Sequence, residues 1–293
     1  MTFNVKKILL ILLFLTTLNA NIPTLNKIDS QFDALLLKDL KSNKILFSSN
    51  INKRIKPASL TKMMTAILAL ESGKLNSVVT ITKEMTEVEP SKAGFEVGEQ
   101  FYLIDLVNSA LIQSANDSSL AIAIFLSGSV ENFAKTMNEK AKKIGMRNSN
   151  FVNPNGLEHK NHYTTSKDLL KLTEYSIKNQ LFNAIVKSKT HQFQSLSTSK
   201  KYTAKNHNKL LDKYEYAVGI KTGYTSKAGP CLVARAKKDN KDLVLIMLDS
   251  RADRWKVATK VFSEFLDKKP AKLANLQQKK KIKKSKAKKT LKT

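Results

Sequence analysis

The chain has 293 residues, of which 42% are hydrophobic and 26% are charged, a composition that predicts a folded domain with a sizeable core and excludes wholesale disorder. The formal net charge is +27, and because residues 268–293 hold twelve lysines and no acidic residue, the rest of the chain carries +15. The single cysteine, Cys231, excludes an internal disulfide.

Residues 1–20 have the pattern of a secretory signal peptide. Lys6 and Lys7 precede an unbroken apolar run at 8–15, and Leu18-Asn19-Ala20 resembles a cleavage site. The run is shorter than the about 20 apolar residues of a transmembrane helix, which makes an uncleaved anchor the less favoured alternative. We therefore expect an exported protein, in the periplasm or associated with the cell envelope.

The apolar pattern of the remaining chain predicts strands at both ends and helices between them. Two strands are expected at 33–47 around a turn at 41–43, and a run of strands at 217–249. Helices are expected at 59–71, 105–113, 117–126, 130–144, 164–179 and 252–266. This order favours a mixed α/β fold with one antiparallel sheet made from both chain ends and an inserted helical body. Residues 21–267 would form this domain, and residues 268–293 a disordered, lysine-rich tail.

Three short motifs follow one another along the predicted domain: Ser59-x-x-Lys62, Ser114-x-Asn116 and Lys221-Thr222-Gly223. Each is weak alone, since Ser-x-x-Lys recurs at 197–200 and 285–288 and Ser-x-Asn at 48–50. An isolated serine and lysine at a helix start are more often a cap and a surface cation. The ordered set, however, supplies the groups for acyl transfer through a covalent serine ester.

The first motif pairs a nucleophile with a base. Ser59 and Lys62 are three residues apart at a predicted helix start, so their side chains share a face. A serine hydroxyl becomes a nucleophile when a base accepts its proton, and a lysine is that base where burial or a nearby cation lowers its pKa. Lys221, at the end of a predicted strand, would be such a cation. The backbone N–H groups at the helix start would favour a developing oxyanion.

The other two motifs carry groups suited to contacting a substrate. Ser114 and Asn116 are predicted in a link between helices, where Ser114 could relay a proton and Asn116 could hold a substrate amide. Thr222 could bind a carboxylate, and Gly223 would let a substrate backbone approach the strand edge. Helix caps and a turn glycine are the alternative explanations.

Together these residues resemble the low-molecular-weight penicillin-binding proteins, which are serine D-alanyl-D-alanine carboxypeptidases. The resemblance spans about residues 30–266 and includes the stretches 57–66, 113–117, 151–157 and 219–225. It implies the penicillin-binding, β-lactamase-like transpeptidase fold and an enzyme that removes the terminal D-Ala of peptidoglycan pentapeptide through an acyl-enzyme. β-Lactams would be inhibitors, and no cofactor or metal is expected.

The resemblance also implies a role for each motif residue. Ser59 would be the nucleophile, Lys62 its base and Ser114 the proton relay. The substrate contacts would be Asn116, Lys221, Thr222 and Gly223, and the backbone N–H groups of Ser59 and Tyr224 would form the oxyanion hole. Some members carry histidine at the position of Tyr224, so only its backbone role is transferred. An arginine beyond the last strand binds the terminal carboxylate in some members; Arg254 is the candidate here and Arg251 the alternative.

Other functions remain open from the sequence. A DD-endopeptidase would use the same residues on cross-linked peptides. A class A β-lactamase is disfavoured because the Glu-x-x-x-Asn base is missing: His162, not asparagine, stands four residues after Glu158. His159 and His162 form His-x-x-His without the helix motif of zinc hydrolases. An exported basic binding protein is the non-catalytic alternative. Nucleic acid is not an expected partner; the tail is expected to contact an anionic envelope surface.

Overall fold

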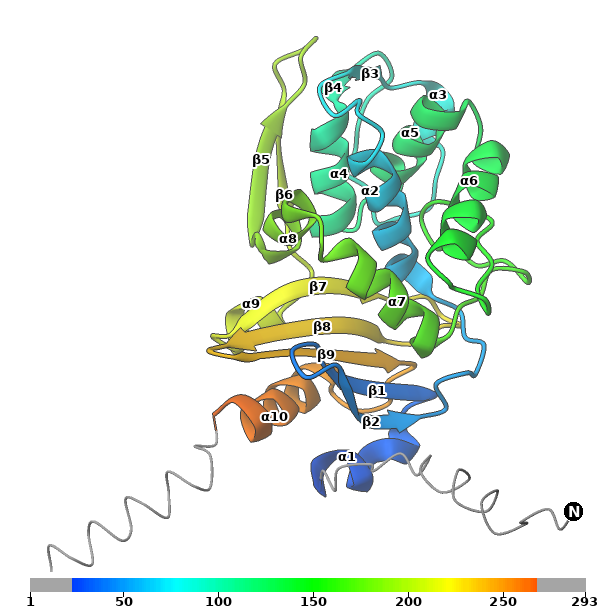
Figure 1. Ribbon diagram of the computed structural model, residues 1–293. Coiled ribbons are helices and arrows are strands. Elements are labelled where there is room, and N and C mark those ends of the chain that lie inside the picture. Colours follow the sequence, from blue (N-terminus) through cyan, green and yellow to red (C-terminus); the bar gives the residue numbers. More distant parts are fainter. Residues whose placement is uncertain (1–22, 268–293) are drawn as a thin grey trace, which may run out of the picture.

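The computed structural model describes residues 23–267 and contains a five-stranded antiparallel sheet in the order β2-β1-β9-β8-β7 (Figure 1). The N-terminal part supplies β1 (Ala34–Asp39) and β2 (Lys44–Ser49). The C-terminal part supplies β7 (Ala217–Gly223), β8 (Cys231–Lys238) and β9 (Lys241–Leu248). β1 pairs with β9 from Ala34 opposite Leu248 to Asp39 opposite Leu243. The predicted sheet made from both chain ends is therefore confirmed.

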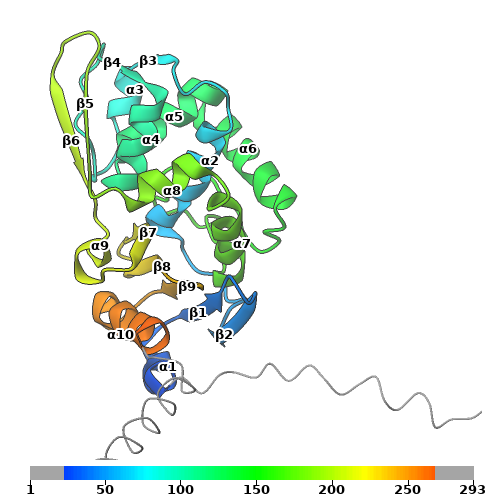
Figure 2. The ribbon, with the colours of Figure 1, turned by 60° about the vertical axis from the view of Figure 1, so that its left-hand side comes forward.

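Both faces of this sheet are covered. α1 (Pro23–Ile28), the 3₁₀ helix η2 (Asp29–Gln31) and α10 (Arg254–Leu266) lie on one side, and the helical body lies on the other (Figure 2). Successive side chains of a strand point to opposite faces, so β1 serves two cores. Leu35 and Leu37 pack with α10, whereas Leu36 packs with the helical body. A strand buried on both faces explains the continuous apolar run in the sequence.

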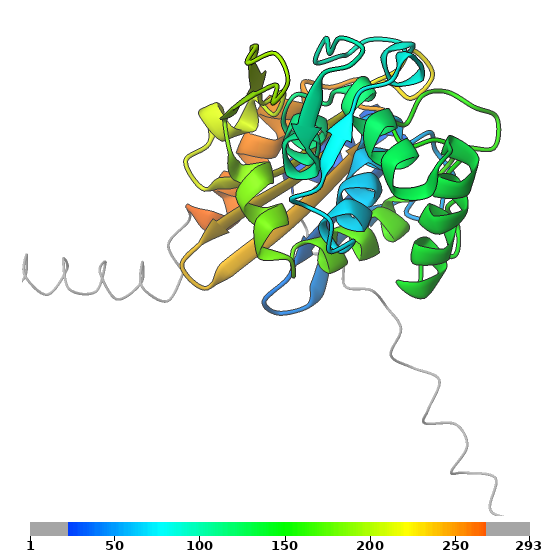
Figure 3. The ribbon, with the colours of Figure 1, turned by 90° about the horizontal axis from the view of Figure 1, so that it is seen from above.

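The helical body is built around α2 (Lys62–Leu70), which packs against five other helices above the sheet (Figure 3). Those helices are α4 (Leu103–Ile112), α5 (Asn116–Ser127), α6 (Val130–Lys143), α7 (Ser166–Ser176) and α8 (Gln180–Lys187). Shorter elements of the body are η3 (Ala58–Thr61) and α3 (Lys83–Thr86), whereas α9 (Leu210–Lys213) packs with α10 on the other side of the sheet. Two hairpins complete the body: β3 (Val78–Thr80) with β4 (Gln100–Tyr102), and β5 (Thr190–Gln194) with β6 (Lys201–Lys205).

The structure corrects three predicted helix boundaries. The segment expected as a helix from Ser59 begins instead as η3, and the α-helix starts only at Lys62. Asn116 is the first residue of α5 rather than part of the preceding link. α7 begins at Ser166, because the side chain of Thr165 caps it by accepting a hydrogen bond from the backbone N–H of Asp168.

The predicted signal peptide (1–20) and lysine-rich tail (268–293) lie outside the described residues. Between residues 23 and 267, no helix has the length and apolar character needed to cross a membrane.

Candidate active site

A cleft of about 970 Å³ lies where η3, the link between α4 and α5, and the end of β7 meet. It is lined by most of the predicted site residues: Ser59, Ser114, Asn116, Thr222, Gly223, Tyr224 and Arg254. Lys62 and Lys221 are buried behind this surface, at 0% and 1% exposure. The structure therefore brings the three sequence motifs together from three separate elements.

The predicted nucleophile and base face each other across a single turn. Side chains three residues apart are eclipsed in a 3₁₀ helix, so the η3 geometry aligns Ser59 with Lys62 more closely than an α-helix would. Lys62 Nζ lies 3.0 Å from Ser59 Oγ. Ser59 is half-buried and lines the cleft, so its hydroxyl remains accessible to a substrate.

The other partners of Lys62 determine where its lone pair points. Lys62 Nζ also lies 2.7 Å from Asn116 Oδ1 and 2.8 Å from the backbone carbonyl oxygen of Asn155. Both of these oxygens only accept hydrogen bonds. A neutral amine has two N–H groups and one lone pair, so the two carbonyl oxygens take the N–H groups and leave the lone pair facing Ser59. The arrangement thus suits Lys62 to accept the hydroxyl proton.

Electrostatics favour the neutral amine. Burial, followed by the nearby charge of Lys221, holds the pKa of Lys62 well below its usual range, against a smaller opposing effect of Asp117. Burial and the Arg254 guanidinium lower the pKa of Lys221 to about 7. Three basic groups, Lys62, Lys221 and Arg254, thus lie at the cleft, and the repulsion between their charged forms is relieved when Lys62 loses its proton or an anion binds.

The second motif is held in a particular backbone geometry. Ser114 has a φ of 64°, in the left-handed region that non-glycine residues rarely adopt. Such strain is typical of sites where the surrounding structure fixes a functional side chain. Asn116 donates from Nδ2 to the backbone oxygen of Glu89 at 2.7 Å and accepts from Lys62 at Oδ1. Its second amide N–H remains available to a substrate carbonyl.

The third motif ends β7, the edge strand of the sheet, where the cleft borders unpaired backbone. Gly223 lines the cleft, and its lack of a side chain also serves packing within the protein. A Cβ there would lie 3.1 Å from Pro57 O and 3.2 Å from Ala58 Cβ, so Gly223 lets the segment before Ser59 pack against the strand. Thr222 is buried to 7% exposure and contributes to the cleft lining.

The two candidate arginines have different surroundings. Arg254 lines the cleft, and its Nη1 donates to the backbone oxygens of Gly223 at 3.0 Å and Cys231 at 2.7 Å. Arg251 is exposed and forms ion pairs with Asp33 and Asp249. The geometry therefore favours Arg254 as the cation that meets a substrate. Tyr224 is 66% exposed at the same rim of the cleft.

Several contributors were not identified from the sequence. Asn155 acts through its backbone oxygen, which has no sequence signature of its own. Asp117, at 1% exposure, accepts from the backbone N–H groups of Ala93 and Gly94 and so fixes the wall of the cleft. No sequence signal indicated Asp117, because its partners are backbone N–H groups of a segment more than 20 residues away.

His207 lines the cleft, and burial together with Lys221 and Lys62 lowers its pKa.

Glu158, His159 and His162, considered from the sequence as a β-lactamase base and as metal ligands, have structural contacts instead. Glu158 accepts hydrogen bonds from Ser226 and from the backbone N–H of Lys227. His162 is buried, whereas His159 is exposed and accepts from the backbone N–H of Asn161. Within residues 23–267, no three histidine, cysteine or acidic side chains gather as metal ligands would.

The fold and the site define a class of protein: an antiparallel sheet covered by a helical body, with a serine-lysine pair at the foot of the central helix, is the penicillin-binding DD-peptidase fold. Residues 19–252 match the family model of peptidase S11, D-alanyl-D-alanine carboxypeptidase, and the chain belongs to this family. The predicted family and fold are confirmed.

Individual relatives agree with this assignment. The chain is 35% identical to the D-alanyl-D-alanine carboxypeptidase DacF of Bacillus subtilis over 219 residues, which are 72% of this chain and 56% of the relative. It is 31% identical to the D-alanyl-D-alanine endopeptidase of Escherichia coli, covering 73% of this chain and 70% of the relative. The crystal structure of the Streptomyces K15 DD-transpeptidase superposes with a TM-score of 0.75 at 27% identity, covering 80% of this chain and 96% of that one. The chain spans little more than half the length of DacF of Bacillus subtilis, DacA of Haemophilus influenzae and DacC of Escherichia coli.

Proposed function

We propose that this protein is a serine D-alanyl-D-alanine carboxypeptidase that removes the terminal D-Ala from peptidoglycan stem peptides. The observation that carries the proposal is the 3.0 Å contact between Ser59 Oγ and Lys62 Nζ, with two carbonyl oxygens holding the remaining N–H groups of the amine. Membership of the S11 family and relatives named as carboxypeptidases support the same activity.

The proposed reaction has two covalent steps. Lys62 takes the hydroxyl proton as Ser59 Oγ attacks the carbonyl carbon of the penultimate D-Ala, with the backbone N–H groups of Ser59 and Tyr224 stabilising the oxyanion. Ser114 passes a proton to the leaving amine, and the terminal D-Ala departs. Water then cleaves the ester and restores the hydroxyl. Asn116 holds the acyl part of the substrate, and Thr222 binds its terminal carboxylate. Lys221 and Arg254 supply positive charge near this carboxylate.

The test is covalent trapping followed by product analysis. Penicillin should raise the intact protein mass by one adduct, and the Ser59→Ala variant should show no adduct while remaining folded by circular dichroism. Labelling that persists in Ser59→Ala would contradict the assignment of the nucleophile. A matched control is Ser197→Ala, in the second Ser-x-x-Lys run, because Ser197 lies on the turn between β5 and β6 and its Lys200 pairs with Glu96.

A DD-endopeptidase is the second candidate, because one relative at 31% identity bears that name. Incubation with a pentapeptide ending in D-Ala-D-Ala and, separately, with a cross-linked dimer distinguishes the two activities. Release of free D-Ala from the first substrate supports the carboxypeptidase. Conversion of the dimer to monomers without release of D-Ala would support the endopeptidase instead.

We further propose that the protein is exported and acts in the periplasm or at the cell envelope, with residues 268–293 as an electrostatic tether. The support is the signal-like pattern at 1–20 and the twelve lysines of the tail. Each lysine close to an anionic surface contributes about 1 kcal/mol, and salt screens this attraction. Deleting 268–293 should leave turnover of a soluble peptide unchanged and reduce sedimentation with envelope fragments at low salt. Unchanged sedimentation would contradict the tether.

A further inference from the structure

The loop from Phe151 to Thr164 lies along the segment that carries Ser59 and Lys62, and contacts join the two repeatedly. Ile55 and Thr164 form an isolated β-bridge, with N–O distances of 2.8 and 2.9 Å. The remaining contacts are Lys56 Nζ to the backbone oxygens of His159 and Lys160, Lys62 Nζ to Asn155 O, and Thr65 Oγ1 to Pro154 O. The loop therefore carries the carbonyl that orients the amine of Lys62.

One side chain of this loop reaches the segment between the predicted nucleophile and base. His162 Nε2 lies 2.9 Å from the hydroxyl of Thr61, which stands between Ser59 and Lys62 in the chain. On the other side of the ring, the backbone N–H of Val152 points at His162 Nδ1 and donates to it at 3.4 Å. Since Nδ1 accepts, the neutral ring carries its proton on Nε2 and donates it to Thr61.

The environment of His162 keeps this contact constant. The ring is 1% exposed and packs edge-on against Phe151, with centroids 5.7 Å apart. Burial, with smaller effects from Lys56 and His159, lowers the pKa of His162 to about 3. The imidazole is therefore neutral at neutral pH.

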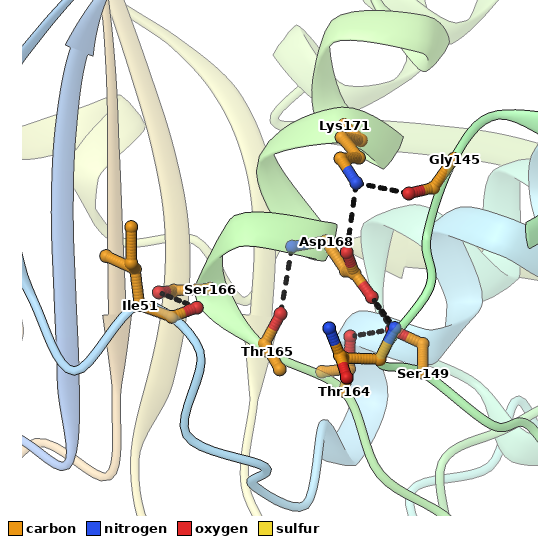
Figure 4. A network of polar contacts seen from close by, with 9 residues as sticks. Ile51, Gly145, Ser149, Thr164, Thr165, Ser166, Asp168 and Lys171 are labelled. Atoms are coloured by element: carbon orange, nitrogen blue, oxygen red, sulfur yellow. Dashed lines mark hydrogen bonds and ion pairs between the residues drawn. The ribbon is translucent and has the colours of Figure 1, made fainter.

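The ends of the loop are anchored separately from His162. Asp168, near the start of α7, accepts from the backbone N–H of Asn148 at 2.7 Å and from the Ser149 hydroxyl at 2.9 Å, and Ser149 bonds to the Thr164 hydroxyl (Figure 4). Lys171 joins Asp168 to the backbone oxygen of Gly145 in the same network. Loss of the ring contact would therefore change the middle of the loop while its ends stay in place.

We propose that His162 is a positioning residue for the reaction, which acts through Thr61 and the 151–164 loop to hold Asn155 O at the amine of Lys62. The inference rests on the proposed function, in which Lys62 is the base. If the middle of the loop shifts, Lys62 loses one of the two acceptors that direct its lone pair at Ser59. A displacement of 1 Å at such a group can reduce a rate by about 10²-fold.

The experiment separates the chemical step from binding. Acylation by a chromogenic penicillin is followed under single-turnover conditions over a range of concentrations, which gives the acylation rate constant k2 and the dissociation constant K of the non-covalent complex. The unaltered protein is measured first; if it forms no adduct, the proposed function fails and the role of His162 does not enter. The variants are His162→Gln, His162→Leu and Thr61→Val, with His159→Gln as the matched control in the same loop.

For His162→Leu and Thr61→Val we expect k2 to fall by about 10- to 100-fold while K stays close to that of the unaltered protein. His162→Gln places an amide N–H near the position of Nε2, so it should recover most of k2, and His159→Gln should leave both constants unchanged. The proposal is overturned if Thr61→Val, which keeps the side-chain shape, retains full k2. Equal losses of k2 in His162→Gln and His162→Leu, or a loss confined to K, would also overturn it. Thr61→Val and His162→Gln decide the matter if His162→Leu does not fold.

Discussion

A Cβ atom added at Gly156 would lie 1.9 Å from the backbone carbonyl oxygen of Ala58, the residue before Ser59. The two backbones are packed against each other, and Gly156 has a φ of +86°. Gly156→Ala should therefore be strongly destabilising, because the left-handed conformation alone costs about 1–2 kcal/mol and the overlap must be relieved by moving one of the segments. Thermal unfolding and penicillin acylation should both be impaired.

The control for this prediction is Gly73→Ala. Gly73 has a similar φ of +72°, but no atom lies within 4 Å of its added Cβ. It therefore reports the conformational cost without the overlap. If both variants lose the same stability and both keep acylation, the close packing at Ala58 has no separate effect.

Replacing Lys62 should abolish acylation without unfolding the protein. Lys62→Ala removes the proposed base, and general-base assistance is typically worth about 10²–10⁴-fold in rate. Lys62→Arg should fail as well, because a guanidinium does not lose its proton near neutral pH. Penicillin labelling gives the rate and circular dichroism reports the fold. Acylation at a near-normal rate in either variant would mean that another group takes the proton.

The pH dependence should show the ionisation of Lys221. In the proposed reaction the ammonium group of Lys221 attracts the substrate carboxylate, and this positive charge disappears as pH rises through its pKa of about 7. The value of kcat/KM for a D-Ala-D-Ala peptide, which reports groups of the free enzyme, should therefore fall above neutral pH. In the proposed mechanism the neutral form of Lys62 is the active one. A rising side of the profile would therefore report the loss of its proton, whose pKa burial and Lys221 lower.

Lys221→Arg identifies the falling side of this profile. Arginine keeps its charge, so any remaining activity should no longer fall above neutral pH. A falling side that stays in place in this variant would assign it to a group other than Lys221.

Arg254→Ala should harm turnover of D-Ala-D-Ala peptides more than acylation by penicillin. A lost hydrogen bond to a charged group costs about 1.5–3 kcal/mol, and the peptide is the ligand whose carboxylate this cation would suit. Because Arg254 also bonds to Gly223 O and Cys231 O, the melting temperature of the variant should be measured alongside. Arg251→Ala is the control; equal effects on both reactions in Arg254→Ala would argue against a role at the carboxylate.

The larger elements of the fold could be predicted because their patterns are strong. α6 was expected at 130–144 and is Val130–Lys143, and the buried strands β8 and β9 read as apolar runs between turns. The hairpin of β5 and β6 was not predicted. In β5 only Phe193 is buried, so the alternation that identifies a strand is nearly absent there. β6 does alternate, with Tyr202 and Ala204 buried, but over only five residues.

The candidate site was predictable where it is made of side chains. Ser59, Lys62 and Lys221 carry side chains with a distinctive pattern along the chain, and the structure brings them together. Asn155 contributes its backbone oxygen, and Gly156 contributes a close fit of its backbone against Ala58. The amino-acid sequence carries little information about where a backbone atom lies. Gly156 could be recognised as a turn residue, but its fit against Ala58 depends on a distant segment and needed the structure.

The pairing of β1 with β9 has a consequence for the order in which the molecule is completed. The hairpin of β1 and β2 leaves the ribosome early, yet the inner edge of β1 has no partner until Leu248 has been synthesised. Contacts between residues so distant in sequence slow folding and prolong the life of incomplete states. A chain that stops before β9 would keep an open apolar strand edge, which can pair with another molecule and start aggregation.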